Sequence, residues 1–191
     1  MATAPAPYWP IVYVRGYAMT PAEIADAVSS PYMGFNVGAT KLRQAWDGQV
    51  RRHVFESPLV RLMKDCGYRD IYTDGTEIIG PVPARSVVIY RYYDSADPDL
   101  GAGKAPSIVA AAEGLRDLVH RLRVQVCGDD AEALAGFKVH LVAHSMGGLV
   151  CRCFLQNDAV STPADRALVD KVFTYATPHN GIEMAGLNVP A

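Results

Sequence analysis

The sequence predicts a doubly wound α/β domain with a mostly parallel sheet flanked by helices, on two observations. Four apolar runs rich in β-branched and aromatic residues are separated by segments with helical spacing; the runs are Ile11–Val14, Ser86–Tyr93, Phe137–Ala143 and Lys171–Ala176. Their hydrophobicity is continuous, which is typical of strands covered on both faces of a parallel sheet. Right-handed crossovers between alternating strands and helices then make neighbouring strands parallel.

Helix signals fill the intervals between these runs. The predicted helices are Pro21–Val28, Ser57–Cys66, Pro106–Val126 and Gly148–Gln156. The second is the best defined, because Ser57 can cap its amino end, Pro58 suits the first helical position and Gly67 suits the stop. A long segment, about residues 29–83, separates the first two predicted strands and exceeds what a simple crossover needs. We interpret it either as an insertion near the mouth of a site or as a structural surface excursion.

Composition excludes several classes of protein. The chain has 191 residues, half of them apolar and a fifth charged, which is typical of one globular domain. Eighteen basic and twenty acidic residues leave no polybasic surface, so no nucleic-acid partner is expected. No stretch approaches the roughly 18 apolar residues of a membrane helix, and the first ten residues lack the pattern of a signal peptide. These features predict a soluble, cytoplasmic protein without a transmembrane segment.

Cysteine and histidine spacing gives no sign of a metal or a cofactor. The four cysteines are too few and too scattered for a disulfide framework, and we expect buried or idle thiols. His140 and His144 lie four residues apart on a strand and a turn, without a third ligand. We therefore expect no metal site and no cofactor.

The strongest chemical signal is the segment AHSMGGLV at residues 143–150. It places Ser145 on a tight turn between an apolar strand and a helix, with Ala143 and Gly147 two positions on either side. A serine that projects its hydroxyl from such a turn has strained backbone angles, and larger side chains at 143 and 147 would collide across the turn. His144 is expected to pack within the turn, pointing away from the serine hydroxyl. The alternative is a serine that merely caps the following helix.

The same turn supplies an electrostatic environment for a negative charge. The helix that starts after Ser145 directs free N–H groups and the positive end of its dipole toward the turn. The backbone N–H of Met146 is therefore a candidate oxyanion donor. The strand Ile11–Val14 ends at Gly16, and the N–H of Tyr17 is a candidate second donor if this strand lies beside Phe137–Ala143, at the switch point of the sheet. The alternative for Gly16 is an ordinary turn glycine.

A third segment, YATPHNG at residues 175–181, is another strand that runs into a polar turn. Together, AHSMGGLV, VRGY (residues 14–17) and YATPHNG resemble the nucleophile elbow, the oxyanion turn and a following loop of the serine α/β-hydrolases, especially lipase-like and inositol-deacylase-like esterases. The resemblance lies at these motifs. Ala143 stands where glycine is commoner, and Arg15 stands where many members have histidine.

The resemblance implies an α/β-hydrolase fold and acyl transfer to water. Ser145 would attack the ester carbonyl, the N–H groups of Met146 and Tyr17 would hold the oxyanion, and a histidine backed by Asp or Glu would move the proton. Ala143, His144, Gly147 and Gly16 would support the turns. The implied substrate is an ester or lipid-like small molecule.

The triad acid and base are not found in this chain. The family order is serine, then acid, then histidine. Only fifteen residues follow Ala176, without a further strand pattern, whereas a βαβ unit needs roughly 30 or more. His179 is the one downstream histidine and is expected at the rim of a substrate site. We therefore expect residues 1–191 to be a single α/β-hydrolase domain, incomplete at its C-terminus, with the triad Asp and His beyond Ala191.

Three functions remain open from the sequence. The leading one is a cofactor-free lipase or esterase that works through an acyl-enzyme at Ser145. An acyltransferase or thioesterase would use the same serine. A hydrolase-fold fragment without catalytic activity would act as a binding module, consistent with the missing acid and base.

Overall fold

The computed structural model describes residues 8–16, 41–44, 47–53, 58–71, 80–99, 101–184 and 187–189. Its main feature is a five-stranded sheet in the order β4-β5-β1-β6-β7, in which every neighbouring pair is parallel. The strands are β1 (Ile11–Val14), β4 (Arg69–Ile71), β5 (Ser86–Tyr90), β6 (Val139–His144) and β7 (Val169–Tyr175). The predicted α/β class with a parallel sheet is confirmed.

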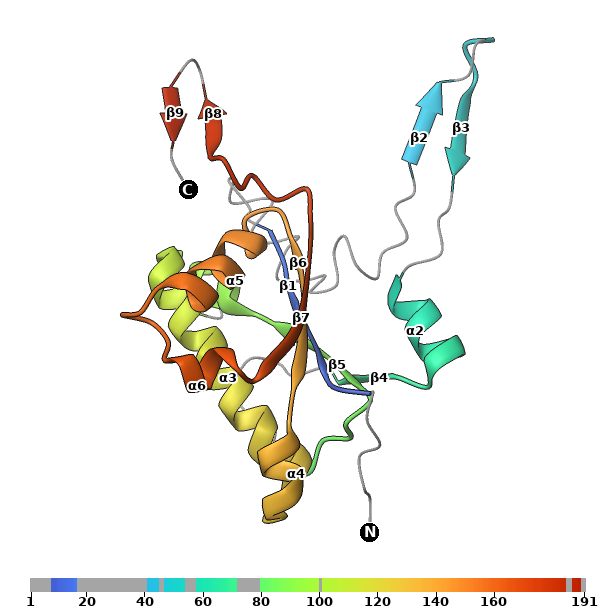
Figure 1. Ribbon diagram of the computed structural model, residues 1–191. Helices are drawn as coiled ribbons and strands as arrows, with labels where there is room; N and C mark the ends of the chain where they lie inside the picture. The colour runs from blue at the N-terminus through green and yellow to red at the C-terminus, as the bar shows by residue number, and fades with distance from the viewer. Residues whose placement is uncertain are drawn as a thin grey trace.

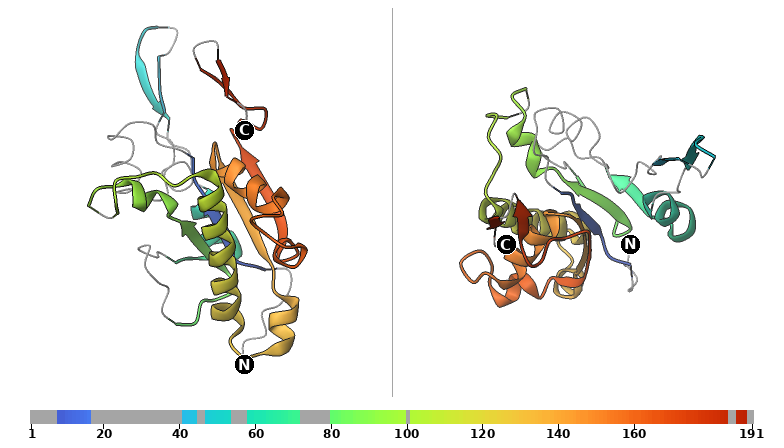
Figure 2. Two further views of the ribbon diagram at one scale, coloured as in Figure 1. Left: turned by 90° about the vertical axis from the view of Figure 1, so that its left-hand side faces the viewer. Right: turned by 90° about the horizontal axis from the view of Figure 1, so that it is seen from above.

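Helices lie on both sides of this sheet (Figure 1). On one side are α3 (Ile108–Cys127), α5 (Gly147–Gln156) and the short α6 (Pro163–Arg166), and α4 (Ala131–Gly136) follows α3. On the other side is α2 (Pro58–Cys66). Seen from above in Figure 2, the strands separate α2 from the group of helices around α3. Within the described ranges, no helix combines the length and apolar composition needed to cross a membrane.

Two small hairpins stand apart from the main sheet. One pairs β2 (Lys41–Gln44) with β3 (Val50–His53), and the other pairs β8 (Ile182–Met184) with β9 (Leu187–Val189). Both extend beyond the carboxyl ends of the sheet strands, at the top of Figure 1. The expectation of no further strand after Ala176 is therefore wrong. Strands of three residues are too short to show a hydrophobic period.

Several strands and helices begin or end at other residues than the sequence predicted. The predicted strand Ser86–Tyr93 ends at Tyr90, and Tyr92–Ala96 forms a 3₁₀ helix whose tyrosines turn into the core. The α3 helix begins after Ser107, whose side chain accepts a hydrogen bond from the N–H of Ala110, and it stops at Gly128, which has φ 57°. The predicted helix Pro21–Val28 and the cap Ser57 lie outside the described residues.

Besides the two hairpins and the 3₁₀ helix, the sequence prediction missed β4, α4 and α6. The edge strand β4 lies inside the 29–83 segment, and charged Arg69 and Asp70 hide its strand character. Asp130 caps α4 through the N–H groups of Glu132 and Ala133. The helix α6 begins with a capping box between Thr162 and Asp165, with Pro163 at its first position. The capping box was visible in the sequence, whereas a three-residue strand was not.

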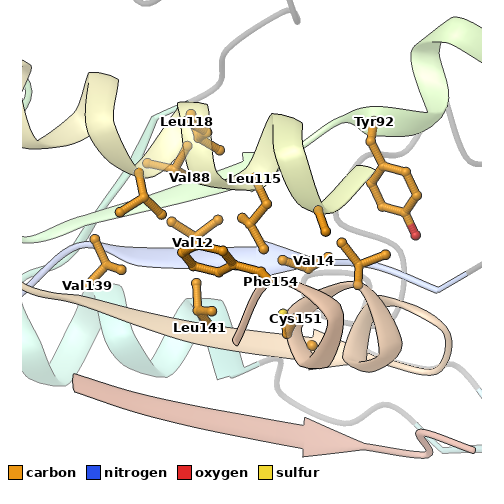
Figure 3. Packing of buried hydrophobic residues seen from close by; sticks show 14 of the residues in the cluster. Val12, Val14, Val88, Tyr92, Leu115, Leu118, Val139, Leu141, Cys151 and Phe154 are labelled. Carbon is orange, nitrogen blue, oxygen red and sulfur yellow. The ribbon is translucent and has the colours of Figure 1, made fainter. Parts of the chain in front are cut away.

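The core divides into two layers because alternate residues of a strand point to opposite faces. Val12 and Val14 of β1 pack with Leu115 of α3 and with Cys151 and Phe154 of α5 (Figure 3). On the opposite face, Ile11 and Tyr13 join Tyr68, Val87 and Ile89, against Leu62 and Cys66 around α2. Every residue of β1 is buried, as the continuous apolar run predicted.

The prediction that strands are covered on both faces of the sheet is wrong for β6 and β7. Along β6, Val139, Leu141 and Ala143 are buried while the residues between them are only half-buried. In β7, Val172 is 40% and Phe173 is 63% exposed. The half-buried residues of β6 and Phe173 of β7 lie on the face of α2, the one described helix there, and α2 lies at the opposite end of the sheet. Val172 is opposite Leu141 and points to the α5 face, where β7 is the edge strand. A continuous apolar run therefore did not distinguish the central strand from the edge strand.

Replacing Leu115 with alanine tests the larger core layer. The leucine is fully buried between α3 and the sheet, and its truncation leaves a cavity. We expect a loss of about 2–5 kcal/mol in the free energy of unfolding, measured by urea denaturation. Val124→Ala on the same helix is the control, because Val124 is 60% exposed and its truncation is expected to cost less than about 0.5 kcal/mol. Equal losses would contradict the assigned core.

Candidate active site

Ser145 occupies the turn between β6 and α5, and its backbone is in the left-handed region with φ 52°. Only two described non-glycine residues have a positive φ, the other being Ala176. Such a conformation is uncommon for a residue with a Cβ atom and persists only where its surroundings enforce it. The strand, strained serine and helix match the structural context that the nucleophile-elbow pattern requires. A serine that merely caps a helix would have extended backbone angles.

Hydrogen bonds fix the backbone on both sides of the turn. The N–H of Ser145 donates to the carbonyl of Tyr175 at 3.0 Å, and the N–H of Gly148 donates to the carbonyl of Ser145 at 3.0 Å. The carbonyl of Met146 accepts from Leu149 and Val150 at 2.9 and 3.2 Å. Among the described residues, no acceptor takes the N–H of Met146. That N–H group lies at the amino end of α5, directly after Ser145.

The strand β1 lies beside β6, with Ile11 opposite His140 and Val14 opposite Ala143. The chain leaves β1 toward β4 on one side and leaves β6 toward β7 on the other, so the two strands flank the switch point of the sheet. In open α/β sheets, ligands bind outside the carboxyl ends of the strands at this point. The expected neighbourhood of the first and third predicted strands is confirmed.

Two glycines allow the end of β1 to approach the turn. A Cβ atom on Gly16 would lie 2.5 Å from the Cβ of Ser145, and one on Gly147 would lie 2.2 Å from the carbonyl oxygen of Val14. Both separations are closer than atoms tolerate, so these positions need glycine. The close contact explains Gly16 better than an ordinary turn does. Tyr17, the expected second oxyanion donor, lies outside the described residues.

Gly148 was not singled out from the sequence, although it packs against the loop after β7. A Cβ atom at this position would lie 2.2 Å from the Oγ1 of Thr177. That hydroxyl is buried and has no hydrogen-bond partner among the described residues. The only available signal was the second glycine of the Met-Gly-Gly sequence, which also fits an ordinary helix start. The contact brings the 175–181 segment onto the amino end of α5.

His179 lies on this loop and is exposed to solvent. Its Nε2 is 3.1 Å from the Oγ1 of Thr174, and its carbonyl accepts a hydrogen bond from Arg152 of α5 at 2.8 Å. Arg152 also lines a hollow of about 610 Å³ along α5, together with Ile108, Leu149, Cys153, Gln156, Asn157 and Asp158. The position of His179 is compatible with the expected substrate rim, which stays a prediction.

The other histidines with placed side chains are also engaged away from the serine hydroxyl. The ring of His144 packs against the ring of Tyr175 at 4.9 Å, as expected for packing in the turn. His120 is bonded to Asp165 at 2.7 Å, and His140 lies 3.5 Å from Asp170. Within the described part of the chain, no imidazole is hydrogen-bonded to the Ser145 hydroxyl.

Other nucleophiles and metal ligands near the site are weak candidates. Burial raises the pKa of Cys151 to about 12, so this thiol stays protonated near neutral pH. Among the described side chains, no group of three His, Cys, Asp or Glu residues is placed to hold a metal ion. Ser145 is therefore the candidate nucleophile that remains among the described residues of this turn.

Comparisons with models of known protein families, with curated proteins and with solved structures each return no match to this chain.

Gly147→Ala tests the close packing of α5 against β1. The added methyl group would meet the backbone at Val14 and Arg15, which cannot move aside as a flexible side chain would. We expect the free energy of unfolding to fall by about 1–3 kcal/mol in urea denaturation. The control is Gly136→Ala at the end of α4, where nothing lies within 4 Å of an added Cβ and no loss is expected. A neutral Gly147→Ala would contradict the packing.

Acidification is expected to destabilise the protein through two histidines. Burial lowers the pKa of His140, with opposing effects of Asp170 and Lys171, and burial followed by the Arg15 cation lowers the pKa of His144. The folded state therefore binds these protons less readily than the unfolded chain. The stabilisation is complete above the unfolded histidine pKa of about 6.5 and is lost as the pH falls through the lower folded values.

Urea denaturation from about pH 7.5 to about pH 5.5 at constant ionic strength measures this loss. His140→Gln should flatten part of the dependence. The pKa of Asp165 is lowered chiefly by its hydrogen bond from the Thr162 backbone, so this carboxylate does not titrate in that window. A free energy of unfolding that stays constant or rises on acidification would show the assignment to be wrong.

Proposed function

We propose that this protein is a serine hydrolase that cleaves carboxylic esters through an acyl-enzyme at Ser145. The observation that carries the proposal is the left-handed turn at Ser145 between β6 and α5, with the N–H of Met146 left without an acceptor among the described residues. A strained serine and an amide donor at the same turn are two of the groups that acyl transfer requires, and the third is a general base. The sequence resemblance to lipase-like esterases supports the same reaction.

In the proposed reaction, the Oγ of Ser145 attacks the carbonyl carbon of the ester while its proton passes to a general base. The negative charge that develops on the carbonyl oxygen is held by the N–H of Met146 and, by the resemblance, the N–H of Tyr17. The C–O bond to the alcohol breaks, and the alcohol leaves with the proton from the base. Water then attacks the acyl-serine, the acid is released and the Ser145 hydroxyl is restored.

The position of α5 supports this assignment electrostatically. Its ten residues begin at Gly147, directly after the turn, so the positive end of its dipole lies beside the reacting carbonyl. Removing one such oxyanion donor in a serine hydrolase slows the reaction by about 100- to 1,000-fold, which indicates the weight of this contribution. The base is the triad histidine that the resemblance implies, with an acidic residue to orient it.

A binding module without catalysis is the second candidate, favoured by one observation. Each described histidine with a placed side chain contacts a group other than the Ser145 hydroxyl. A serine without a general base is a weak nucleophile. The same site, with its free amide and glycine-lined approach, would then hold a carbonyl or carboxylate ligand without cleaving it.

Covalent labelling with a fluorophosphonate probe separates the two candidates. We expect labelling of the wild-type protein and its loss in Ser145→Ala, with the modified peptide identified by mass spectrometry. Ser95→Ala is the control, because Ser95 is exposed and its hydroxyl donates to the carbonyl of Tyr92 rather than taking part in the site. Labelling that persists in Ser145→Ala would rule out Ser145 as the nucleophile. A full-length gene product that stays unlabelled and does not cleave a short-chain aryl ester would favour the binding module.

A further inference from the structure

Tyr175, the last residue of β7, contacts the two other strands that end at the candidate site, β1 and β6. Its carbonyl accepts the hydrogen bond from the N–H of Ser145 at 3.0 Å. Its ring packs against the ring of His144, with centroids 4.9 Å apart. Its hydroxyl lies 3.0 Å from the hydroxyl of Tyr13 on β1. One residue therefore joins the ends of β1 and β6 through main-chain and side-chain contacts.

The register of the sheet explains this reach. Tyr13 is opposite Val142, and Val142 is opposite Phe173, so these three side chains share one face. Tyr175 follows Phe173 by two positions and points to the same face. The hydroxyl groups of Tyr13 and Tyr175 meet above β6, so the two side chains span the roughly 10 Å between β1 and β7. The hydrogen bond therefore ties strands that do not pair directly.

Burial of apolar side chains contributes little to holding the end of β7, although its backbone pairs with β6 as far as Tyr175. Val172 is 40% and Phe173 is 63% exposed, so burial of these side chains stabilises the strand only weakly. Directly after Tyr175 the chain turns at Ala176, which has φ 53°, beside the strained turn at Ser145. A strained turn keeps its geometry only where its surroundings enforce it. The contacts of Tyr175 help to enforce it from the β7 side, together with the backbone pairing to β6 and the packing of Thr177 on Gly148.

The contact with His144 extends the effect to the β1 side of the site. The His144 Nδ1 lies 3.0 Å from where a Cβ on Gly16 would be, so the imidazole fills the space between Tyr175 and the end of β1. A shift of Tyr175 would release the ring of His144. The same shift would therefore weaken the packing of Gly16 against Ser145 and the hydrogen bond that the Ser145 N–H donates to Tyr175.

We propose that Tyr175 is a positioning residue for Ser145, and that its hydrogen bond with Tyr13 holds the left-handed serine turn against β1. The catalytic consequence of this tether rests on the proposed function. The structural consequence, a fixed backbone at residues 144–148, does not depend on catalysis. Burial raises the pKa of both phenols, so the hydroxyl groups stay protonated at assay pH and the hydrogen bond persists.

The test removes each hydroxyl and keeps each ring. In Tyr175→Phe and Tyr13→Phe, we expect the maximal rate of fluorophosphonate labelling to fall about tenfold, since small misplacements of a reacting group slow reactions by up to about 100-fold. The probe concentration that gives half the maximal rate should change less than about twofold, because probe binding is not altered. The double variant should be no slower than the slower single variant, as expected for two halves of one interaction.

Tyr90→Phe is the matched control. Tyr90 is on the neighbouring strand β5, and its hydroxyl donates to the carbonyl of Ala111 on α3 at 2.7 Å, away from Ser145. Removal of the Tyr90 hydroxyl should lower the melting temperature about as much as removal of the Tyr13 or the Tyr175 hydroxyl. The labelling rate should stay unchanged. A labelling rate that is unchanged in Tyr175→Phe and Tyr13→Phe, or that falls equally in all three variants, overturns the positioning role.

Amide hydrogen exchange, read by mass spectrometry on peptides covering residues 144–149, is the second measurement. Exchange should be faster in Tyr175→Phe and Tyr13→Phe than in the wild-type protein and in Tyr90→Phe. This readout does not require a reactive serine. If the wild-type protein is not labelled, the proposed function fails, while faster exchange still supports the tether. Unchanged exchange in both variants overturns the tether whether or not Ser145 is labelled.

Discussion

The close approach of backbone segments at the carboxyl ends of β1, β6 and β7 is the constraint on which the candidate site depends. Gly147 packs against Val14, and Gly16 packs against Ser145. An added Cβ atom would lie 2.2 Å from the Val14 carbonyl oxygen in the first case and 2.5 Å from the Ser145 Cβ in the second. Only residues without a side chain allow three strand ends and one helix start to meet at this spacing. The left-handed turn at Ser145 is held in this crowded region rather than chosen by its own conformational preference.

The two faces of the sheet contribute differently to this arrangement. On one face, α3 and α5 bury Val12, Val14 and Leu141 in a continuous apolar layer, which fixes β1 and β6 side by side. On the other face, the described contacts near the site are aromatic and polar, among Tyr13, His144 and Tyr175. Stability therefore comes mainly from the α3 and α5 side. Fine positioning of the serine turn comes from directional contacts on the opposite side.

This division explains which parts of the fold were predictable. The central strand β1 is buried on both faces, and its apolar run predicted its bounds exactly as observed, Ile11–Val14. The strand β7 also has an apolar pair, Val172 and Phe173, but lies at the sheet edge, where these side chains are exposed. Hydrophobicity along a chain reports that a segment is suited to a strand. It does not report how many neighbours that strand has.

The sequence by itself indicated the strand, turn and helix around Ser145, because these follow from local patterns. It also predicted a small residue at Gly147, although the collision that requires it is with the β1 backbone at Val14 and Arg15 rather than across the turn. It also indicated the glycine at position 16, although not the atom that requires it. Only the tertiary structure decided that Thr177 packs against Gly148 and that the hydroxyl of Tyr175 bonds to that of Tyr13. It also decided that His144 packs between Tyr175 and Gly16. Those contacts join residues far apart in the chain, and their partners are set by sheet order and register, which no local pattern encodes.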